Sequence, residues 1–239
     1  MKKIAFFVEG QTEQFFLNKL LIEIAGSKNI FIKLKKFKGK GKPTEDILPK
    51  TLSQPSHQVN HTVLIYDCAG DGSVKSRILE EYRDLRKNGY AEIVGLRDLY
   101  PLPDLQKLTR RLNNGLVING KRIEEALPND TSIVVAVREI EEWFLAECNH
   151  YVCIDASLNY AVVSSLGFNP CTDDLTIRSN SAALDLHAIY QLAGKHYNKK
   201  KDNVDRTLSC LDYTNLYLNV RHKIPKLNDL ITKIDAFLS

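Results

Sequence analysis

Carboxylates follow the apolar runs of this sequence at the points where the runs end. Glu9 comes directly after residues 4–8, and Asp67 directly after residues 62–66. The other acids at or near such ends are Glu13, Asp71, Asp98, Glu139, Glu141 and Glu142. Carboxylate oxygens are the ligands that Mg²⁺ and Mn²⁺ favour. An ion held in this way activates water and stabilises charge on a phosphoryl group, so we expect Mg²⁺- or Mn²⁺-dependent phosphoester chemistry.

A plainer interpretation of each acid stays open, because the ends of strands are polar wherever loops meet water. This interpretation is weakest for Glu9 and Asp67, which directly follow apolar runs and precede glycine-containing turns. Glu13 also suits the first turn of a helix, where negative charge is favoured. Glu139 and Glu142 are three residues apart and would share a helix face as ordinary solvated acids.

The elements that position these acids alternate between strands and helices over the first two-thirds of the chain. Strands are expected at residues 4–8, 30–37, 62–66, 92–96 and 132–137. We expect Thr12 to cap a helix that Gly26 ends, and Ser73 to cap a second that Gly89 ends. Further helices are predicted from Ser181 to Ala193 and from Pro225 onward.

The predicted fold class is α/β, with a mostly parallel sheet flanked by helices and a helical C-terminal extension. We expect a first domain at residues 1–150 and a helical region at residues 151–239 packed on it. Because the carboxyl ends of parallel strands lie at one edge of a sheet, acids that are distant in sequence can meet there.

Composition is that of an ordinary globular protein, with 239 residues, 44% hydrophobic content and a net charge of +4. The five cysteines are scattered and include no Cys-x-x-Cys pair, so we expect reduced thiols in a cytoplasmic protein. No signal peptide, membrane span, zinc-ligand spacing, Walker A loop or Gly-x-Ser-x-Gly motif is evident. Trp143 is expected to pack in the core.

Two motifs resemble a known family. Residues 8–13 read VEGQTE and residues 139–147 read EIEEWFLAE. The first resembles the Toprim domain of topoisomerases, primases and overcoming-lysogenization-defect nucleases. The second resembles a segment of an uncharacterised Toprim-like family from bacterial and phage-defence gene neighbourhoods. Together they cover about residues 4–148.

The resemblance implies roles for the acids. Glu9 would be a metal ligand or general acid/base, and Asp67 the first aspartate of an Asp-x-Asp pair. Ala69 stands where the second aspartate is expected, so either Asp71 replaces that ligand or metal binding is weakened. Asp98 is a competing candidate, and the family's further metal-binding glutamates would match Glu139 and Glu141. Glu13 completes the candidate metal ligands, and the expected catalytic set is Glu9, Asp67 and Asp71.

Two lysine clusters are candidate nucleic-acid contacts. Lys38, Lys40 and Lys42 lie in a glycine-containing stretch, and Lys199 and Lys200 in a basic stretch near tyrosines. Such groups suit a phosphate backbone. Lysines that protect an edge strand, or a solvated turn, explain them as well.

The foremost hypothesis is a metal-dependent phosphoesterase, a Toprim-type nuclease of DNA or RNA in antiviral defence. One alternative is a non-catalytic interaction or effector subunit of an ATPase-containing defence complex, in which the core has lost its second aspartate. A nucleotidyl- or phosphotransferase is another. The partner ATPase is implied by the resemblance and by no residue of this chain.

Overall fold

The computed structural model describes residues 1–37, 44–45, 50–51, 59–70 and 72–239. The chain divides into two compact units, of which the first comprises residues 1–135 with 232–239 and the second residues 136–231. This division differs from the boundary expected at residue 150. The segment 139–147 consequently belongs to the second unit. Each unit is described by itself.

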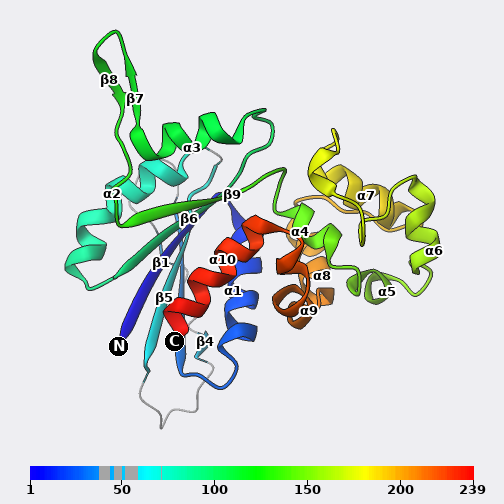
Figure 1. Ribbon diagram of the computed structural model, residues 1–239. Coiled ribbons are helices and arrows are strands. Elements are labelled where there is room, and N and C mark those ends of the chain that lie inside the picture. The colour runs from blue at the N-terminus through cyan, green and yellow to red at the C-terminus, as the bar shows by residue number, and fades with distance from the viewer. Residues whose placement is uncertain (38–43, 46–49, 52–58, 71) are drawn as a thin grey trace. The chain divides into compact units, whose positions relative to one another are not determined.

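The first unit is built on a mostly parallel sheet, as predicted (Figure 1). Its main strands are β1 (Lys2–Val8), β2 (Ile30–Lys36), β5 (His61–Asp67), β6 (Glu92–Asp98) and β9 (Thr131–Ala136), in the order β2-β5-β1-β6-β9. The pairs β2–β5, β5–β1 and β1–β6 are parallel. The short strands β3 (Thr44–Glu45) and β4 (Lys50–Thr51) pair antiparallel with β2.

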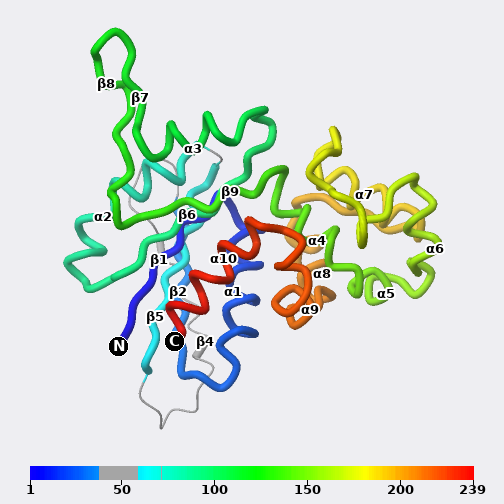
Figure 2. Tube along the Cα trace, viewed as in Figure 1, coloured from blue at the N-terminus to red at the C-terminus, as the bar shows by residue number. Residues whose placement is uncertain are grey.

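Helices cover both faces of this sheet, which explains why its central strands are apolar throughout. The side chains of Ile4 to Val8 in β1 are fully buried. Helix α1 (Gln11–Ala25) connects β1 to β2, and α2 (Val74–Lys87) connects β5 to β6 in the opposite direction across the sheet (Figure 2). Since such connections are right-handed, they place α1 and α2 on opposite faces.

The first helix begins earlier than predicted. Gly10, not Thr12, is the N-cap, and its N–H donates to the Glu13 carboxylate over 2.9 Å. A glutamate at the third helical position can reach back in this way, so the cap needs no serine or threonine side chain. The predicted ends at Gly26 and Gly89 are confirmed, since both have positive φ angles just after their helices.

Between β6 and β9 lie α3 (Leu105–Asn114) and a hairpin of β7 (Leu116–Ile118) and β8 (Lys121–Glu124). The hairpin projects away from the sheet (Figure 1). Its turn residues Asn119 and Gly120 have φ angles of 49° and 76°. An Asn-Gly pair with positive φ at both positions is the signature of a two-residue hairpin turn, so the sequence carried a signal for it.

The second unit is helical, as the pattern beyond residue 150 indicated. Its helices are α4 (Glu141–Ala146), α5 (His150–Ile154), α6 (Tyr160–Val163), α7 (Ala182–Gln191), α8 (Lys201–Cys210), α9 (Tyr213–Leu218) and the first part of α10 (Pro225–Leu238). Trp143 is fully buried, which confirms its predicted place in the core. None of the helices in the described ranges has the length and apolar character that crossing a bilayer requires.

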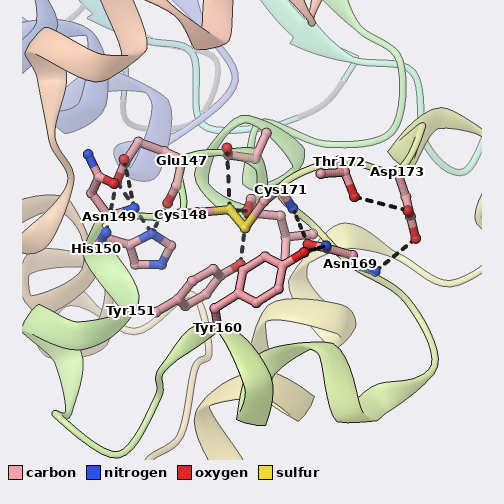
Figure 3. The surroundings of a disulfide bond; sticks show 12 residues. Glu147, Cys148, Asn149, His150, Tyr151, Tyr160, Asn169, Cys171, Thr172 and Asp173 are labelled. Carbon is pink, nitrogen blue, oxygen red and sulfur yellow. Dashed lines mark hydrogen bonds and ion pairs between the residues drawn. A yellow bond between two sulfur atoms is a disulfide. The ribbon is translucent and has the colours of Figure 1, made fainter.

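Four of the five cysteines form disulfides in the second unit, so the prediction of reduced thiols is wrong for them. Cys148 pairs with Cys171 (Figure 3), and Cys153 pairs with Cys210, with Cα atoms 5.8 and 5.5 Å apart. The partners are 23 and 57 residues apart in sequence, and folding alone brings them together. Cys68 is a free, buried thiol. Disulfides persist mainly in oxidising surroundings, so these two pairs do not favour the cytoplasmic location. That location stays a prediction.

Gly95 in β6 offers a test of the packing between sheet and helix. A Cβ at this position would lie 2.6 Å from Cγ1 of Ile133 and 2.9 Å from Cγ1 of Val74. We expect Gly95→Ala to lower the free energy of unfolding by about 1–3 kcal/mol, as overpacking does. The control is Gly72→Ala, because nothing lies within 4 Å of a Cβ there. Equal stabilities of the two variants in denaturant unfolding would contradict this close packing.

Candidate functional site

The sheet brings three of the predicted acids to one edge of the first unit. Val8 at the end of β1 lies opposite Asp67 of β5 on one side and Leu96 of β6 on the other. Asp67, Glu9 and Asp98 therefore stand at the carboxyl ends of three neighbouring parallel strands. Their exposed fractions are 2%, 6% and 6%. Buried carboxylates at this edge need compensating partners.

Arg97 is the partner of Glu9. Its Nε lies 3.6 Å from Oε1 of Glu9 and donates over 3.3 Å to the carbonyl of Asp98. Arg97 follows Leu96, and Glu9 follows Val8, so the parallel register sets the two residues side by side. Sequence reasoning assigned no role to Arg97. The sequence signal for it is that Glu9 and Arg97 are each the first residue after an apolar run, and that the two runs belong to neighbouring strands.

Asp67 is held by the end of the neighbouring strand and by its own loop. Its Oδ2 lies 3.2 Å from Nζ of Lys36, which stands opposite it in β2. Its Oδ1 accepts the N–H of Ala69 over 2.9 Å. Ala69 itself has a φ of 58°, and the N–H of Gly70 donates to the carbonyl of Glu9. The methyl group of Ala69 offers no ligand where the resemblance implies an aspartate.

The remaining predicted acids of the first unit are Glu13 and Asp71. The Glu13 carboxylate caps α1, as an acid of the first turn. Asp71 lies outside the described residues. Among the described residues, no three ligand groups within this unit lie within 4.8 Å of one another. The described acids of this unit thus share an edge, and no three of them form a ligand group there.

In the second unit, Glu139 and Glu141 share one cation. Nζ of Lys199 lies 3.2 Å from Oε1 of Glu139 and 3.4 Å from Oε2 of Glu141. The Tyr197 hydroxyl donates to Oε1 of Glu141 over 2.8 Å, and the N–H of Ala183 donates to Oε2 of Glu139 over 3.0 Å. Both glutamates are buried, whereas the Lys199 side chain is 47% exposed. The ammonium therefore closes this pair toward solvent.

The electrostatics explain why this pair takes a cation. Burial raises the pKa of Glu141, and the neighbouring charge of Glu139 raises it further, whereas Lys199 and Tyr197 oppose the shift. The donors are oxygen atoms, which fit Mg²⁺ or Mn²⁺ as well as an ammonium. Asp98 of the first unit and this glutamate pair are buried carboxylates of the type that could hold a divalent ion.

Glu142 does not act with Glu139. The expectation that the two share a helix face is wrong, because α4 begins at Glu141 and leaves Glu139 outside the helix. Burial raises the pKa of Glu142 to about 7. Glu142 lines a separate cavity of the second unit together with Cys171 and Asp174.

Glu147, the last acid of the same motif, is structural. It is fully buried and accepts the N–H groups of Asn149, His150 and Asp212 and the side-chain amide of Asn215. Figure 3 shows its carboxylate beside the start of α5. Burial raises the pKa of Glu147, but its hydrogen bonds outweigh burial and hold the pKa below the ordinary value. The carboxylate therefore stays charged and joins α5 to α9.

A buried ion cluster supports the segment that leads to Ala183. Asp185 Oδ2 lies 2.7 Å from Nη2 of Arg138 and 2.8 Å from Nε of Arg178. Arg138 also donates to the carbonyl of Leu175 over 3.2 Å. Sequence reasoning missed this cluster, because its members are up to 47 residues apart. It orders the chain before α7, whose first turn binds Glu139.

Of the five lysines predicted to contact nucleic acid, the structure describes Lys199 and Lys200. Lys38, Lys40 and Lys42 lie outside the described residues. Lys199 is engaged by Glu139 and Glu141, and Lys200 is exposed at the N-cap of α8. A role of these lysines in binding nucleic acid stays a prediction.

Comparison with known proteins adds no relative. No family model matches this chain, and neither a curated protein nor a solved structure matches it. The resemblance to Toprim proteins therefore depends on the two motifs alone.

Asp185→Asn tests the buried cluster. Burial raises the pKa of Asp185, but the hydrogen bonds and charges of Arg178 and Arg138 outweigh burial and depress the pKa below its ordinary value. A carboxylate whose pKa is depressed by folding stabilises the folded state at pH values above its pKa in the unfolded chain. This stability is lost as the pH falls through the pKa of the folded state. We expect the variant to lose about 3–5 kcal/mol at pH 7, and the difference from wild type to shrink below about pH 4. Denaturant unfolding measures this, with exposed Asp84→Asn as control. A loss that does not depend on pH would contradict the assignment.

Lys199→Met tests the glutamate pair. The substitution removes the ammonium that Glu139 and Glu141 share. A divalent ion should therefore stabilise the variant more than the wild type. We expect saturating Mn²⁺, about 100 times its Kd, to add roughly 2.7 kcal/mol to the stability of the variant. Thermal unfolding with and without Mn²⁺ measures this, with Lys200→Met as the matched control. Equal responses of the three proteins would exclude a cation site at this pair.

Proposed function

We propose that the protein is a divalent-metal-dependent phosphoesterase, a Toprim-like nuclease acting on DNA or RNA. The observation that supports this proposal is the position of Glu9, Asp67 and Asp98 at the carboxyl ends of three adjacent parallel strands. In α/β folds, ligands bind outside this edge. The VEGQTE and EIEEWFLAE motifs point in the same direction.

Each group at this edge has a task in the proposed reaction. Asp67 and Asp98 would contribute metal ligands, and Glu9 would act as a ligand or as general acid/base. Arg97, 3.6 Å from Glu9, would orient that carboxylate and attract a phosphate oxygen. Bound Mg²⁺ or Mn²⁺ would supply Lewis acidity and an activated water. Glu139 and Glu141 are further candidate ligands, because their pair already holds a cation.

The biological setting of the proposal comes from the resemblance. The resemblance places such proteins in antiviral defence. It also implies a partner ATPase, which would bind the ATP, since this chain has no nucleotide-triphosphate motif of its own. Lys200 is exposed and available for a phosphate backbone.

A non-catalytic interaction module is the second candidate. It is favoured by Ala69 at the position of the second aspartate, and by the basic partners of Asp67 and Glu9 within the fold. In this case Lys36 and Arg97 would serve as permanent counter-ions. Calorimetry with Mg²⁺ and Mn²⁺ separates the two functions, since no binding at millimolar metal favours the module.

Glu9→Gln tests the nuclease. The purified protein with Mn²⁺ is expected to cleave single- or double-stranded DNA or RNA. The substitution removes a charge but keeps the size of the side chain, and we expect it to slow cleavage roughly 100-fold or more. Exposed Glu23→Gln in α1 is the control. Unchanged cleavage by Glu9→Gln would refute the assigned role of Glu9.

A further inference from the structure

A cavity of about 430 Å³ lies in the first unit next to the acidic edge. It is lined by α2, α3 and β8 and by the end of β6, with Leu79, Leu108 and Leu112 as its apolar side. Arg97 belongs both to this lining and to the ion pair with Glu9. The size is that of a pocket for a small molecule, and the lining combines apolar contact with a few charged groups.

Most charges of the lining are neutralised within the fold. Nε of Arg111 donates to both carboxylate oxygens of Glu124, over 3.0 and 2.9 Å. Glu125 pairs with Arg122 over 2.9 Å, and Arg97 pairs with Glu9. The ion pair of Lys75 with Glu124 is the longest of these, with 3.9 Å between Nζ and Oε2.

Lys75 is a buried ammonium with unused hydrogen-bonding capacity. The residue is 9% exposed. Its Nζ donates to the carbonyl of Arg111 over 2.8 Å, which is its single hydrogen bond to the described residues, and lies 3.9 Å from Glu124. An ammonium has three N–H donors, so two remain for a ligand. Burial lowers the pKa of Lys75, and an anion in the cavity would relieve this desolvation.

We propose that this cavity binds a nucleoside monophosphate unit, with the phosphate at Lys75 and Arg97 and the nucleoside against the leucines. An ammonium with unused N–H donors and an arginine in the same lining suit a phosphate group. An apolar wall suits a planar base. The proposal rests on the proposed phosphoesterase function, in which the pocket would hold the nucleotide next to the phosphodiester at the acidic edge.

Binding is tested without metal, so that no catalysis is needed. In EDTA, calorimetric titrations use AMP, dAMP, adenosine and inorganic phosphate as probes. We expect AMP or dAMP to bind at least tenfold more tightly than adenosine and phosphate, because only the nucleotides engage both sides of the cavity. Lys75→Met should weaken nucleotide binding at least tenfold. Lys87→Met, an exposed lysine of the same helix, should leave it unchanged.

A second variant covers the case in which Lys75→Met fails to fold. Ser76 is exposed and lines the same cavity, so Ser76→Trp fills it without disturbing the core. We expect this variant to keep its unfolding temperature and lose nucleotide binding. Absence of nucleotide binding by the wild type, or binding that survives either substitution, would overturn the proposal.

The outcome for the cavity is distinguishable from that for the proposed function. Nucleotide binding without metal-dependent cleavage would keep the pocket and reject the nuclease. Cleavage with a KM that neither Lys75→Met nor Ser76→Trp raises would keep the nuclease and reject the pocket.

Discussion

A carboxylate that leaves water must gain a compensating charge or hydrogen bonds, and this requirement recurs throughout the protein. Asp67 lies beside Lys36, and Glu9 beside Arg97. Asp185 binds two arginines, and Glu139 and Glu141 share Lys199. Glu147 instead uses N–H donors of the main chain and a side-chain amide. Each of these buried acids therefore has a compensating partner, and the partner decides what the acid can do. Glu142 is different, because burial raises its pKa to about 7.

The compensation also separates structural from functional acids. Asp185 and Glu147 are saturated by several fixed donors and hold the second unit together. Glu139 and Glu141 are joined by the ammonium of one half-exposed lysine, and this is the position where we propose that a divalent ion would bind. Arg97 has a dual position, since it compensates Glu9 and lines the cavity that holds Lys75. In the proposed reaction, it links the acid to the substrate.

Local signals were sufficient for much of the fold. The sequence predicts the buried strand β1 and the glycines that end α1 and α2, because sterics and burial act within a few residues. The start of α1 was misplaced, since Glu13 and the Gly10 backbone cap it without the side chain of Thr12. The Asn119-Gly120 turn of the hairpin is also a local signal, since both residues have positive φ angles. The disulfides had none, because pairing depends on folded proximity.

The sequence by itself determined the α/β class and the acids that end the strands, because apolar runs and their boundaries are local properties. It could not determine which base stands beside each acid. Lys36 meets Asp67 and Arg97 meets Glu9 through the register of the parallel sheet, and Lys199 meets Glu139 from 60 residues away. Those partners, and the cavity at Lys75, were decided by the tertiary structure, because side chains distant in sequence interact only after the chain has folded.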